Sequence, residues 1–293
     1  MSRQEPLAWP DVPPDRIVAF QGVPGAYSHL ACRARFPEMQ AGPCYSFEDA
    51  FAAVREGRAK LAMIPVDNTV AGRVADVHHL MPHGGLHIIG EHFLRVNHQL
   101  LAVRGASLDG IRTVESHTHA LGQCRNFLRR HKLAAVVVAD TAGGAAEVAR
   151  SGDPTRAAIA SAIAAEIYDL QILASDIEDA AHNTTRFLVL SREPVRPPPN
   201  NGPVVTTFVF RVRNVPAALY KALGGFATNG INMVKLESYI DGAFMQARFY
   251  VDVMGHPEEE RLALALEELQ FFAHDVEILG VYPADPFRQG FGG

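Results

Sequence analysis

The sequence predicts an α/β region of two lobes, followed by a smaller ferredoxin-like βαββαβ module. Short apolar segments alternate with amphipathic segments over residues 16–192, which is typical of strands alternating with helices. A proline-rich stretch, EPVRPPPNNGPV, occupies residues 193–204, and a different order of strands and helices fills residues 205–284. The length of 293 residues also favours two domains over one.

Five apolar segments of the first part each precede an amphipathic segment. RIVAF precedes a helix expected from Tyr27, KLAMIPV one from about Val70, IRTVES one from His117, AAVVVAD one from Thr141, and RAAIAS one from Ala162. This alternation indicates α/β layers with largely parallel sheets.

A long apolar stretch near the middle of this part, LHIIGEHFLRVNHQLLAV (residues 86–103), is interpreted as a crossover between the two lobes. The segment TTRFLVL (residues 184–190) would then return to the first lobe. Such a double crossing creates a cleft, which is a common place for small-molecule sites.

The prolines of residues 193–204 favour an extended linker, and Asn-Asn-Gly within it predicts a turn. After the linker, the segments VTTFVFRV, INMVKLESYI, AFMQARFYVDV and HDVEILGVY predict strands, whereas VPAALYKALGGFATNG and PEEERLALALEELQFFA predict helices. The resulting order is βαββαβ, the plan of ferredoxin-like domains.

The composition is that of a soluble globular protein, with 48% hydrophobic and 20% charged residues. A net charge of −5 argues against nucleic acid or anionic membrane as the main partner. The N-terminal residues read as a polar arm without the apolar core of a signal peptide, and no apolar run reaches membrane-spanning length. Three cysteines without CxxC spacing favour a reducing cytoplasm.

Four polar clusters lie at ends of predicted strands in the first part, and ligands of open α/β sheets bind at the carboxyl ends of strands. In the first cluster, FQGVPGAYSH, Gly22 and Gly25 follow a strand and Ser28 enters a helix. Two interpretations stay open: backbone N–H groups that approach an anion, or a tight turn with Ser28 as helix N-cap. The spacing does not match a nucleotide-binding glycine loop.

In the second cluster, MIPVDNTVAGR, the polar residues Asp67, Asn68 and Thr69 lie between a strand and a helix. Helix capping accounts for one of them and leaves the others for a ligand. In the third, VESHTHALGQC, Ser116 is expected to cap a helix and Gln123 to lie two turns further on the same face.

Histidines near these clusters suggest a metal site only weakly. His117 and His119 do not share a helix face, and Pro82 interrupts the run that holds His78, His79 and His83. Cys124 has no basic neighbour in sequence and is interpreted as a buried apolar side chain.

The fourth cluster, AHNTTRFLVLSR, places Thr185 and Arg186 at the mouth of an apolar strand. A polar loop that only caps the strand is one reading. Together, however, the four clusters offer hydroxyls, amides and one guanidinium, which suits a small carboxylated substrate held by Arg186. No Ser-His-Asp order and no carboxylate pair with distinct acid and base roles is recognisable.

The stretches GVPGAYS, IPVDNTVAGRV, SHTHALGQC, AAIAS and NTTRFLVL occur in this order before the βαββαβ module. In this combination the chain resembles the prephenate dehydratase family with its C-terminal regulatory ACT domain. The resemblance extends from about Ile17 to about Tyr282, and the Thr-Arg-Phe triplet is its most specific motif.

The resemblance implies a catalytic domain like the two lobes of periplasmic binding proteins. It also implies conversion of prephenate to phenylpyruvate in L-phenylalanine biosynthesis, by a carbon-oxygen lyase without metal or organic cofactor. By motif, Thr185 corresponds to the catalytic threonine, Arg186 to a carboxylate anchor and Phe187 to a packing residue of the site. The substrate-binding positions implied are Gly22, Gly25, Ser28, Asn68, Ser116 and Gln123.

Several positions depart from the family pattern. Ala26 replaces a threonine, Asp67 a glutamate and His119 a glutamine, while the Thr-Arg-Phe triplet is intact. In the ACT module, the implied phenylalanine site comprises Pro216, Ala217, Ala218, Leu219, Asn232, Glu237 and Ser238. Tyr239 and Ile240 replace the Arg-Pro of that site, so inhibition by phenylalanine is a weaker expectation than catalysis.

The resemblance also implies a homodimer or homotetramer, because a small ACT sheet has an unpaired edge. Three alternatives remain: an arogenate dehydratase, a small-molecule binding protein without catalysis, and a regulatory amino-acid sensor.

Overall fold

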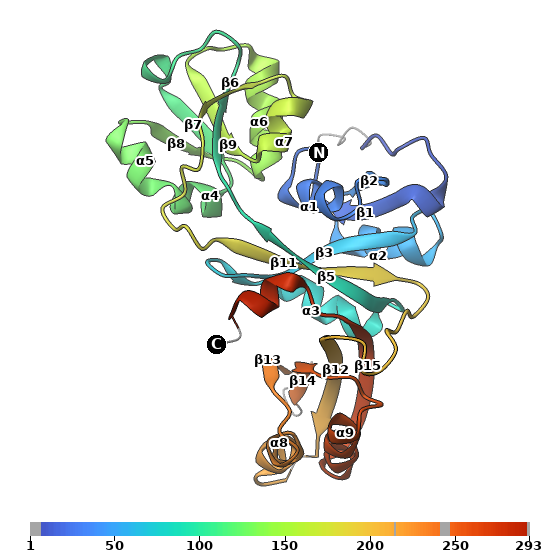
Figure 1. Ribbon diagram of the computed structural model, residues 1–293. Coiled ribbons are helices and arrows are strands. Elements are labelled where there is room, and N and C mark those ends of the chain that lie inside the picture. Colours follow the sequence, from blue (N-terminus) through green and yellow to red (C-terminus); the bar gives the residue numbers. More distant parts are fainter. Residues whose placement is uncertain (1–6, 214, 241–246, 292–293) are drawn as a thin grey trace. The chain divides into compact units, whose positions relative to one another are not determined.

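The computed structural model describes residues 7–213, 215–240 and 247–291. These residues belong to two compact units. Unit 1 comprises Met1–Val74 and Phe93–Phe187, and unit 2 comprises Ala75–His92 and Leu188–Gly293. Figure 1 labels most of the helices and strands of both units, and each unit is described separately below.

Unit 1 contains a first parallel group of strands in the order β2–β1–β3. Its elements are η1 (Pro14–Arg16), β1 (Ile17–Gln21), α1 (Tyr27–Arg35), β2 (Gln40–Cys44), α2 (Phe47–Arg55), β3 (Leu61–Asn68) and β4 (Gly72–Arg73). Strand β1 is buried along nearly its whole length, as expected for a central parallel strand. A capping box between Ser46 and Asp49 begins α2.

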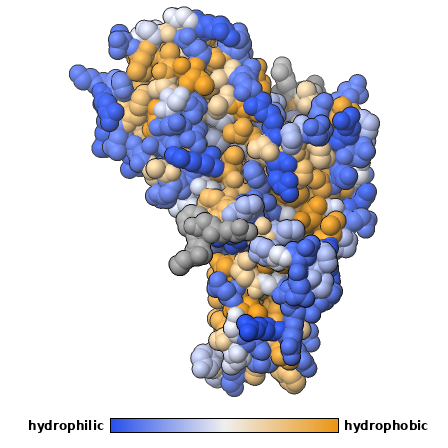
Figure 2. Space-filling model, in the orientation of Figure 1, coloured by the Kyte–Doolittle hydropathy of each residue, from blue (hydrophilic) through white to orange (hydrophobic). Residues whose placement is uncertain are grey.

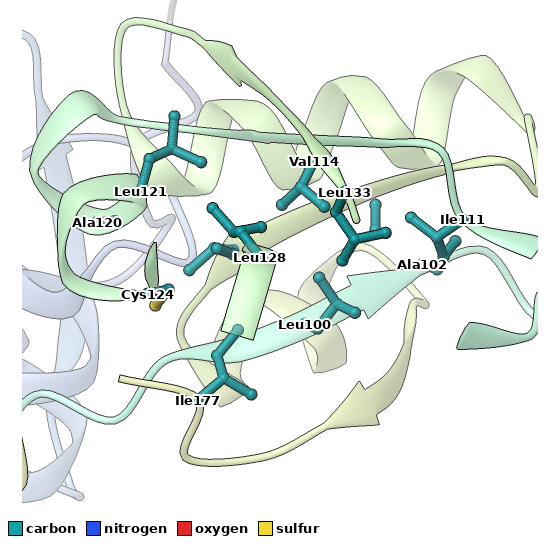
Figure 3. Packing of buried hydrophobic residues seen from close by; sticks show 12 residues of the cluster. Leu100, Ala102, Ile111, Val114, Ala120, Leu121, Cys124, Leu128, Leu133 and Ile177 are labelled. Carbon is teal, nitrogen blue, oxygen red and sulfur yellow. The ribbon is translucent and has the colours of Figure 1, made fainter. Parts of the chain in front are cut away.

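A second sheet of unit 1 has the strand order β10–β6–β9–β7–β8. The elements around it are β6 (Gln99–Ala102), η3 (Leu108–Gly110), β7 (Thr113–Ser116), α4 (Thr118–Gln123), α5 (Arg125–Arg130), β8 (Ala134–Val137), α6 (Thr141–Ser151), β9 (Arg156–Ala160), α7 (Ala162–Ile167) and β10 (Gln171–Ala174). Leu100, Val114 and Leu128 belong to the apolar core under α4 and α5, which Figure 3 shows from close by.

The strands β5 (His87–Arg95) and β11 (Thr184–Ser191) each run from one unit into the other. Their parts in unit 1 meet where the backbone N–H of Val96 donates to the carbonyl of Asn183 at 2.8 Å. Strand β5 leads directly to β6 of the second sheet, and β11 returns from β10 to the larger sheet. The predicted double crossing is therefore confirmed.

Unit 2 contains the βαββαβ module. Its elements are β12 (Val204–Val212), α8 (Ala218–Thr228), β13 (Met233–Ile240), β14 (Ala247–Met254), α9 (Glu260–Phe272) and β15 (Ala273–Pro283). The antiparallel order β13–β14–β12–β15 is that of a ferredoxin-like sheet, and α8 and α9 pack on one face of it around Phe208, Phe226 and Leu266 (Figure 1).

Three further helical segments belong to unit 2: α3 (Ala75–Leu80), η2 (Met81–His83) and η4 (Pro286–Phe291). The unit 2 part of β5 pairs in parallel with β15, where Gly280 lies opposite Ile88. A Cβ at Gly280 would approach the Ile88 Cβ to 2.6 Å, so this close approach requires glycine.

Four of the five predicted helix starts in the first part agree with the structure. The exception is the helix expected from about Val70, because β4 pairs back on β3 there and α3 begins only at Ala75. The strand β2 and helix α2 were not predicted. The turn expected in the linker is present, with φ of +59° at Asn200 and +85° at Gly202. Residues 1–6 of the expected N-terminal arm, and residues 243–246 of the segment AFMQARFYVDV, lie outside the described residues.

Candidate active site

The Thr185 hydroxyl lies at the start of β11, next to the carboxyl end of β3. The Asn68 side chain, at the last residue of β3, donates from Nδ2 to the Thr185 Oγ1 at 2.9 Å. The same Nδ2 donates to the Asn183 Oδ1 at 2.8 Å. Backbone contacts hold the two strands together here, because the Thr69 N–H donates to the Thr184 carbonyl at 3.0 Å. Two of the predicted clusters therefore meet at one point.

The third cluster joins them through Gln123, the last residue of α4. The Asn183 Nδ2 donates to the Gln123 Oε1 at 2.8 Å. The His98 Nε2 lies 2.7 Å from the same oxygen, and the His98 Nδ1 lies 2.7 Å from the Tyr27 hydroxyl. A chain of side-chain hydrogen bonds thus runs from Thr185, through the second sheet, to helix α1.

Arg186 follows Thr185 on the opposite face of β11, as strand alternation predicts. Its side chain is 7% exposed, and its Nη1 lies 3.8 Å from the Asp67 Oδ2. Asp67 is the residue that replaces the family's glutamate, so the shorter carboxylate still lies within ion-pair distance of Arg186. Phe187 is 1% exposed and packs in the core.

The glycine turn before α1 does not offer the backbone donors considered from the sequence. The Gly22 N–H donates to the Cys44 carbonyl at 2.9 Å, and the Gly25 N–H donates to the His29 Nδ1 at 3.2 Å. The turn instead contacts α7, since the Ser161 hydroxyl donates to the Gly25 carbonyl at 2.6 Å. The tight-turn interpretation agrees with these contacts, and the anion-cradle interpretation does not.

Ser28 and Ser116 do not occupy the helix N-cap positions that were predicted for them. Ser28 is the second residue of α1, whose N-cap is Ala26, and the residue is buried. Ser116 ends β7, and the N-cap of α4 is His117. The Ser116 side chain is fully buried and donates to the Ile159 carbonyl at 2.6 Å, which ties β7 to β9. The structure therefore does not bring Ser116 to the polar cluster, nor does a single helix face carry both it and Gln123.

Burial sets the protonation of the groups around Gln123. It lowers the pKa of the His98 imidazole below 6.5, against an opposing effect of the Gln123 hydrogen bond. It also raises the pKa of the Tyr27 phenol well above 10. The imidazole and the phenol are therefore both neutral at pH 7.

None of the three cysteines has the properties of a nucleophile. All three are free and buried. Burial raises the pKa of the Cys44 thiol to about 12 and raises those of Cys32 and Cys124 as well. The interpretation of Cys124 as a buried apolar side chain agrees with its place in the core of the second sheet.

Within the described residues, no group of three histidine, cysteine or acidic side chains is placed to hold a metal ion. The rings of His117 and His119 lie 5.1 Å apart, and burial lowers the pKa of His117. His78 is buried in unit 2 against the rings of Tyr239 and Tyr250.

Sequence reasoning missed Asn183, His98 and Tyr27 as members of this network. Asn183 stands two residues before Thr185, so the alternation of an extended strand places both on one face, and this was the signal that could have found it. His98 lies inside a long apolar stretch, where a histidine is usually a core residue. Only the return of β11 beside β3 places the three residues together.

The positions implied for a phenylalanine site belong to unit 2. Ala217, at φ of +60°, is the N-cap of α8, and Ala218 begins the helix. Glu237 lies on β13 with its carboxylate 3.8 Å from the Lys235 Nζ, and Asn232 and Ser238 are exposed. Among the described strands, β13 is an edge strand of its sheet. Figure 2 shows hydrophobic surface on the drawn face of this module. Tyr220, Leu236 and Phe271 are among the exposed large apolar residues of the module.

No helix in the described part of the chain is long and apolar enough to cross a membrane.

Comparison with known proteins bears directly on this site. The family model described as prephenate dehydratase matches residues 18–195. A protein of Komagataeibacter europaeus, named bifunctional N-acyl-homoserine lactone acylase/prephenate dehydratase, is 51% identical over 94% of this chain and 98% of its own. An Arabidopsis thaliana protein, named arogenate dehydratase/prephenate dehydratase 1, is 40% identical over 92% of this chain and 73% of its own.

Two solved structures have the same fold. One, titled as a novel type of quorum quenching acylase, is 52% identical with a TM-score of 0.89 and covers 93% of this chain and all of its own. The other is a prephenate dehydratase of Arthrobacter aurescens in complex with L-Phe, 30% identical with a TM-score of 0.83, covering 91% of this chain and 89% of its own. The matched model covers both strands that meet at Thr185, β3 and β11, and the chain belongs to the prephenate dehydratase family.

Proposed function

We propose that the protein converts prephenate to phenylpyruvate at the Thr185 hydroxyl, with Arg186 as the anchor of a substrate carboxylate. The observation that supports this most strongly is the hydrogen bond from the Asn68 Nδ2 to the Thr185 Oγ1. Because Thr185 accepts this bond, its own proton is left to donate to another group.

The reaction requires one proton at the leaving oxygen. The bond between the ring and its carboxylate breaks and carbon dioxide leaves, while the electron pair of that bond moves through the ring and expels the ring hydroxyl, which makes the ring aromatic. The departing hydroxyl takes up a proton to become water. A hydroxyl donor at that oxygen stabilises the developing charge, whether it transfers its proton or only donates a hydrogen bond.

Arg186 suits the carboxylate because a guanidinium binds a carboxylate through two parallel hydrogen bonds. It is buried and has Asp67 at 3.8 Å, beyond the length of a direct hydrogen bond. Asp67 orients the guanidinium. Phe187 supports the strand from the core side. Gln123 contacts the substrate and Asn68 holds the Thr185 hydroxyl, while Gly22, Gly25 and Ser28 shape the turn and helix start on that side.

The test is phenylpyruvate formation from prephenate by the wild type, Thr185→Ser and Thr185→Ala. We expect Thr185→Ala to lose about 100-fold or more in kcat, since positioned proton donors contribute on this scale, and Thr185→Ser to keep most of the rate. Nearly equal rates in all three proteins would remove any chemical role of Thr185.

Arogenate is the main alternative substrate, because the Arabidopsis thaliana relative is named for both activities. Arogenate carries an amine where prephenate has a keto group, and its ring chemistry is the same. Parallel assays with both substrates decide the preference. Turnover of arogenate alone would keep the mechanism and change the substrate.

Acylase activity is a second candidate, favoured by the 51% identity to a relative named as an N-acyl-homoserine lactone acylase. The reaction adds water across an amide, breaks the C–N bond and releases a fatty acid and homoserine lactone. Release of fatty acid from such a lactone, measured beside Thr185→Ala, tests it. Loss in the variant would place both activities at one site, and no release by the wild type would exclude the candidate.

Regulation by phenylalanine is part of the same proposal. The support is the L-Phe complex of the Arthrobacter aurescens relative. In this chain the ligand binds near Pro216–Leu219, Asn232, Glu237 and Ser238, and a second subunit pairs along β13 to form a homodimer or homotetramer. Titration of the initial rate with phenylalanine tests the site, and a rate that does not respond at saturation would remove it.

The three free thiols support the cytoplasm as the compartment.

A further inference from the structure

Backbone groups determine which atoms donate and which accept in the hydrogen-bond network, because a backbone N–H can only donate and a backbone carbonyl can only accept. The N–H groups of Val70 and Ala71 donate to the Asn68 Oδ1 at 2.9 and 2.7 Å. They fix the Asn68 amide, so its Nδ2 must face Asn183 and Thr185. The orientation of this side chain therefore follows from the β3–β4 turn.

Asn183 then has a single compatible orientation. Its Oδ1 accepts from the Asn68 Nδ2, so its Nδ2 is the atom that faces Gln123. The atom of Gln123 that accepts this bond must be its oxygen. Asn183 is 2% exposed, which leaves little room for any other arrangement.

His98 is the next member, and its tautomer follows from the same reasoning. The Gln123 Oε1 is an acceptor, so the His98 Nε2 must carry a proton in order to bond with it at 2.7 Å. Burial disfavours the imidazolium, and the neutral ring then has an unprotonated Nδ1. The Tyr27 hydroxyl lies 2.7 Å from this nitrogen and donates to the Asn97 carbonyl at 3.0 Å, so with an unprotonated Nδ1 its one proton is shared between the two acceptors.

The backbone of His98 is also held in place. Its N–H donates to the Glu178 carboxylate at 2.8 Å, and its carbonyl accepts from the Ile177 N–H at 3.0 Å. The ring is 2% exposed. His98 can therefore present its Nε2–H to Gln123 without rearrangement.

Two donors at the end of this network have no partner among the described residues: the Gln123 Nε2 amide and the Thr185 hydroxyl proton. We propose that His98, supported by Tyr27 and together with Asn183, is a positioning residue that turns the Gln123 amide outward, so that it acts with the Thr185 hydroxyl as a donor to substrate oxygen atoms. This inference rests on the proposed function. It assigns the specificity of the site to ligands that present oxygen acceptors, such as a carboxylate or the leaving hydroxyl.

The tautomer can be measured without any assay of activity. Long-range 1H–15N correlation spectra of the full chain, labelled with 15N-histidine, distinguish the protonated nitrogen of each ring. The chain has 13 histidines, and the spectrum of His98→Gln identifies the His98 signals by their loss. We expect a neutral ring with Nε2 protonated at pH 7.5. A ring protonated on Nδ1 alone, or on both nitrogens, would overturn the inference.

A matched pair of variants tests the positioning role. In His98→Gln the side-chain amide can replace the Nε2–H donor, whereas His98→Met has a similar size and no donor. We expect kcat for prephenate to fall about tenfold in His98→Met, because misplaced hydrogen bonds of this kind cost that order of rate, and to stay within about threefold in His98→Gln. The KM for prephenate should rise in His98→Met as well, since the Gln123 amide can then turn its oxygen toward the substrate carboxylate.

The melting temperatures of the two variants provide the structural control. If His98 had only a structural role, kcat would fall equally in both variants and in proportion to their loss of stability, or would not fall at all. This result would overturn the inference. If the wild type does not turn over prephenate, the proposed function fails, and the tautomer measurement still tests the network.

Discussion

Two clusters of polar side chains, one in each unit, differ in how their donors are used. In the first, the donors bond within the cluster, and in the second, some donors have no partner among the described residues. In unit 2, the Thr207 hydroxyl donates to the Asp252 carboxylate at 2.6 Å, and the Tyr282 hydroxyl lies 2.7 Å from the Thr207 oxygen. All three side chains are fully buried. In unit 1, the network of Asn68, Asn183 and Gln123 ends in donors without a partner among the described residues. The closed cluster stabilises a fold, and the open one is prepared for a ligand.

The largest expected effect is a loss of stability on substitution in the closed cluster of Thr207, Asp252 and Tyr282. Thr207→Val keeps the shape of the side chain and removes the donor to Asp252. Because a fully buried carboxylate then loses a hydrogen bond, we expect the free energy of unfolding to fall by about 3 kcal/mol. Urea denaturation followed by circular dichroism measures it.

The matched control is the kcat for prephenate of the folded Thr207→Val protein, which should stay within about twofold of the wild type, because Thr207 lies outside the open network. A stable variant with impaired catalysis would mean that the closed cluster also serves the site, and the comparison would fail.

The next effect concerns the turn that precedes α1. At Gly25 φ is +94°, and a Cβ there would lie 3.1 Å from the Ala164 Cβ. Gly152, with φ of +62°, has open space at the same position. We expect Gly152→Ala to cost about 1 kcal/mol from backbone strain alone, and Gly25→Ala to cost about 2 to 3 kcal/mol, since it also pushes α7 away.

Gly25→Ala should in addition raise the KM for prephenate, because the turn lies on the same side of unit 1 as Tyr27. Denaturation curves and initial rates of the two variants provide the measurement. Equal losses in both would show that contact with α7 adds nothing.

The smallest effect is the dependence of stability on pH that comes from His98. Its pKa is lowered by burial in the folded protein, so the unfolded chain binds more protons as the pH falls below about 6.5. The stability is therefore full above pH 6.5 and is lost as the pH decreases toward the lowered pKa. His29 and His117 have the same direction of shift and contribute to the same loss.

Comparison of the wild type with His98→Gln isolates the contribution of His98 to the pH dependence of stability. Between pH 7.5 and pH 5.5 we expect the variant to lose about 1 kcal/mol less than the wild type, measured by urea denaturation at both values. Identical losses would mean that folding does not lower the pKa of the His98 ring.

Much of the fold followed from local patterns. The strand starts, most helix starts and the order of the C-terminal module depend on apolar periodicity and on residues such as Asp140, which accepts from the Gly143 N–H at the start of α6. The short β4 pairing displaced α3 from its expected start, because Gly72 at φ of +83° allows a hairpin that the sequence pattern did not indicate.

The site was predictable only where motifs marked it. Thr185, Asn68 and Gln123 were singled out because they belong to polar clusters near strand ends, and the structure brings these three together. Ser116 has the same kind of position, yet its hydroxyl is used within the sheet. Whether a polar residue faces a ligand or a neighbouring carbonyl depends on strand pairing over long sequence separations, and His98 and Asn183 came into view only with that pairing.

One measurement tests the central claim most directly: the rate of phenylpyruvate formation from prephenate by Asn68→Asp. An aspartate has the shape of asparagine but cannot donate to the Thr185 Oγ1, so the Thr185 proton would turn toward the new carboxylate and away from the substrate. The account predicts that kcat falls by about 100-fold while the melting temperature stays within a few degrees of the wild type. A variant with the kcat of the wild type would contradict it, because the outward direction of the Thr185 donor would then be irrelevant to the reaction.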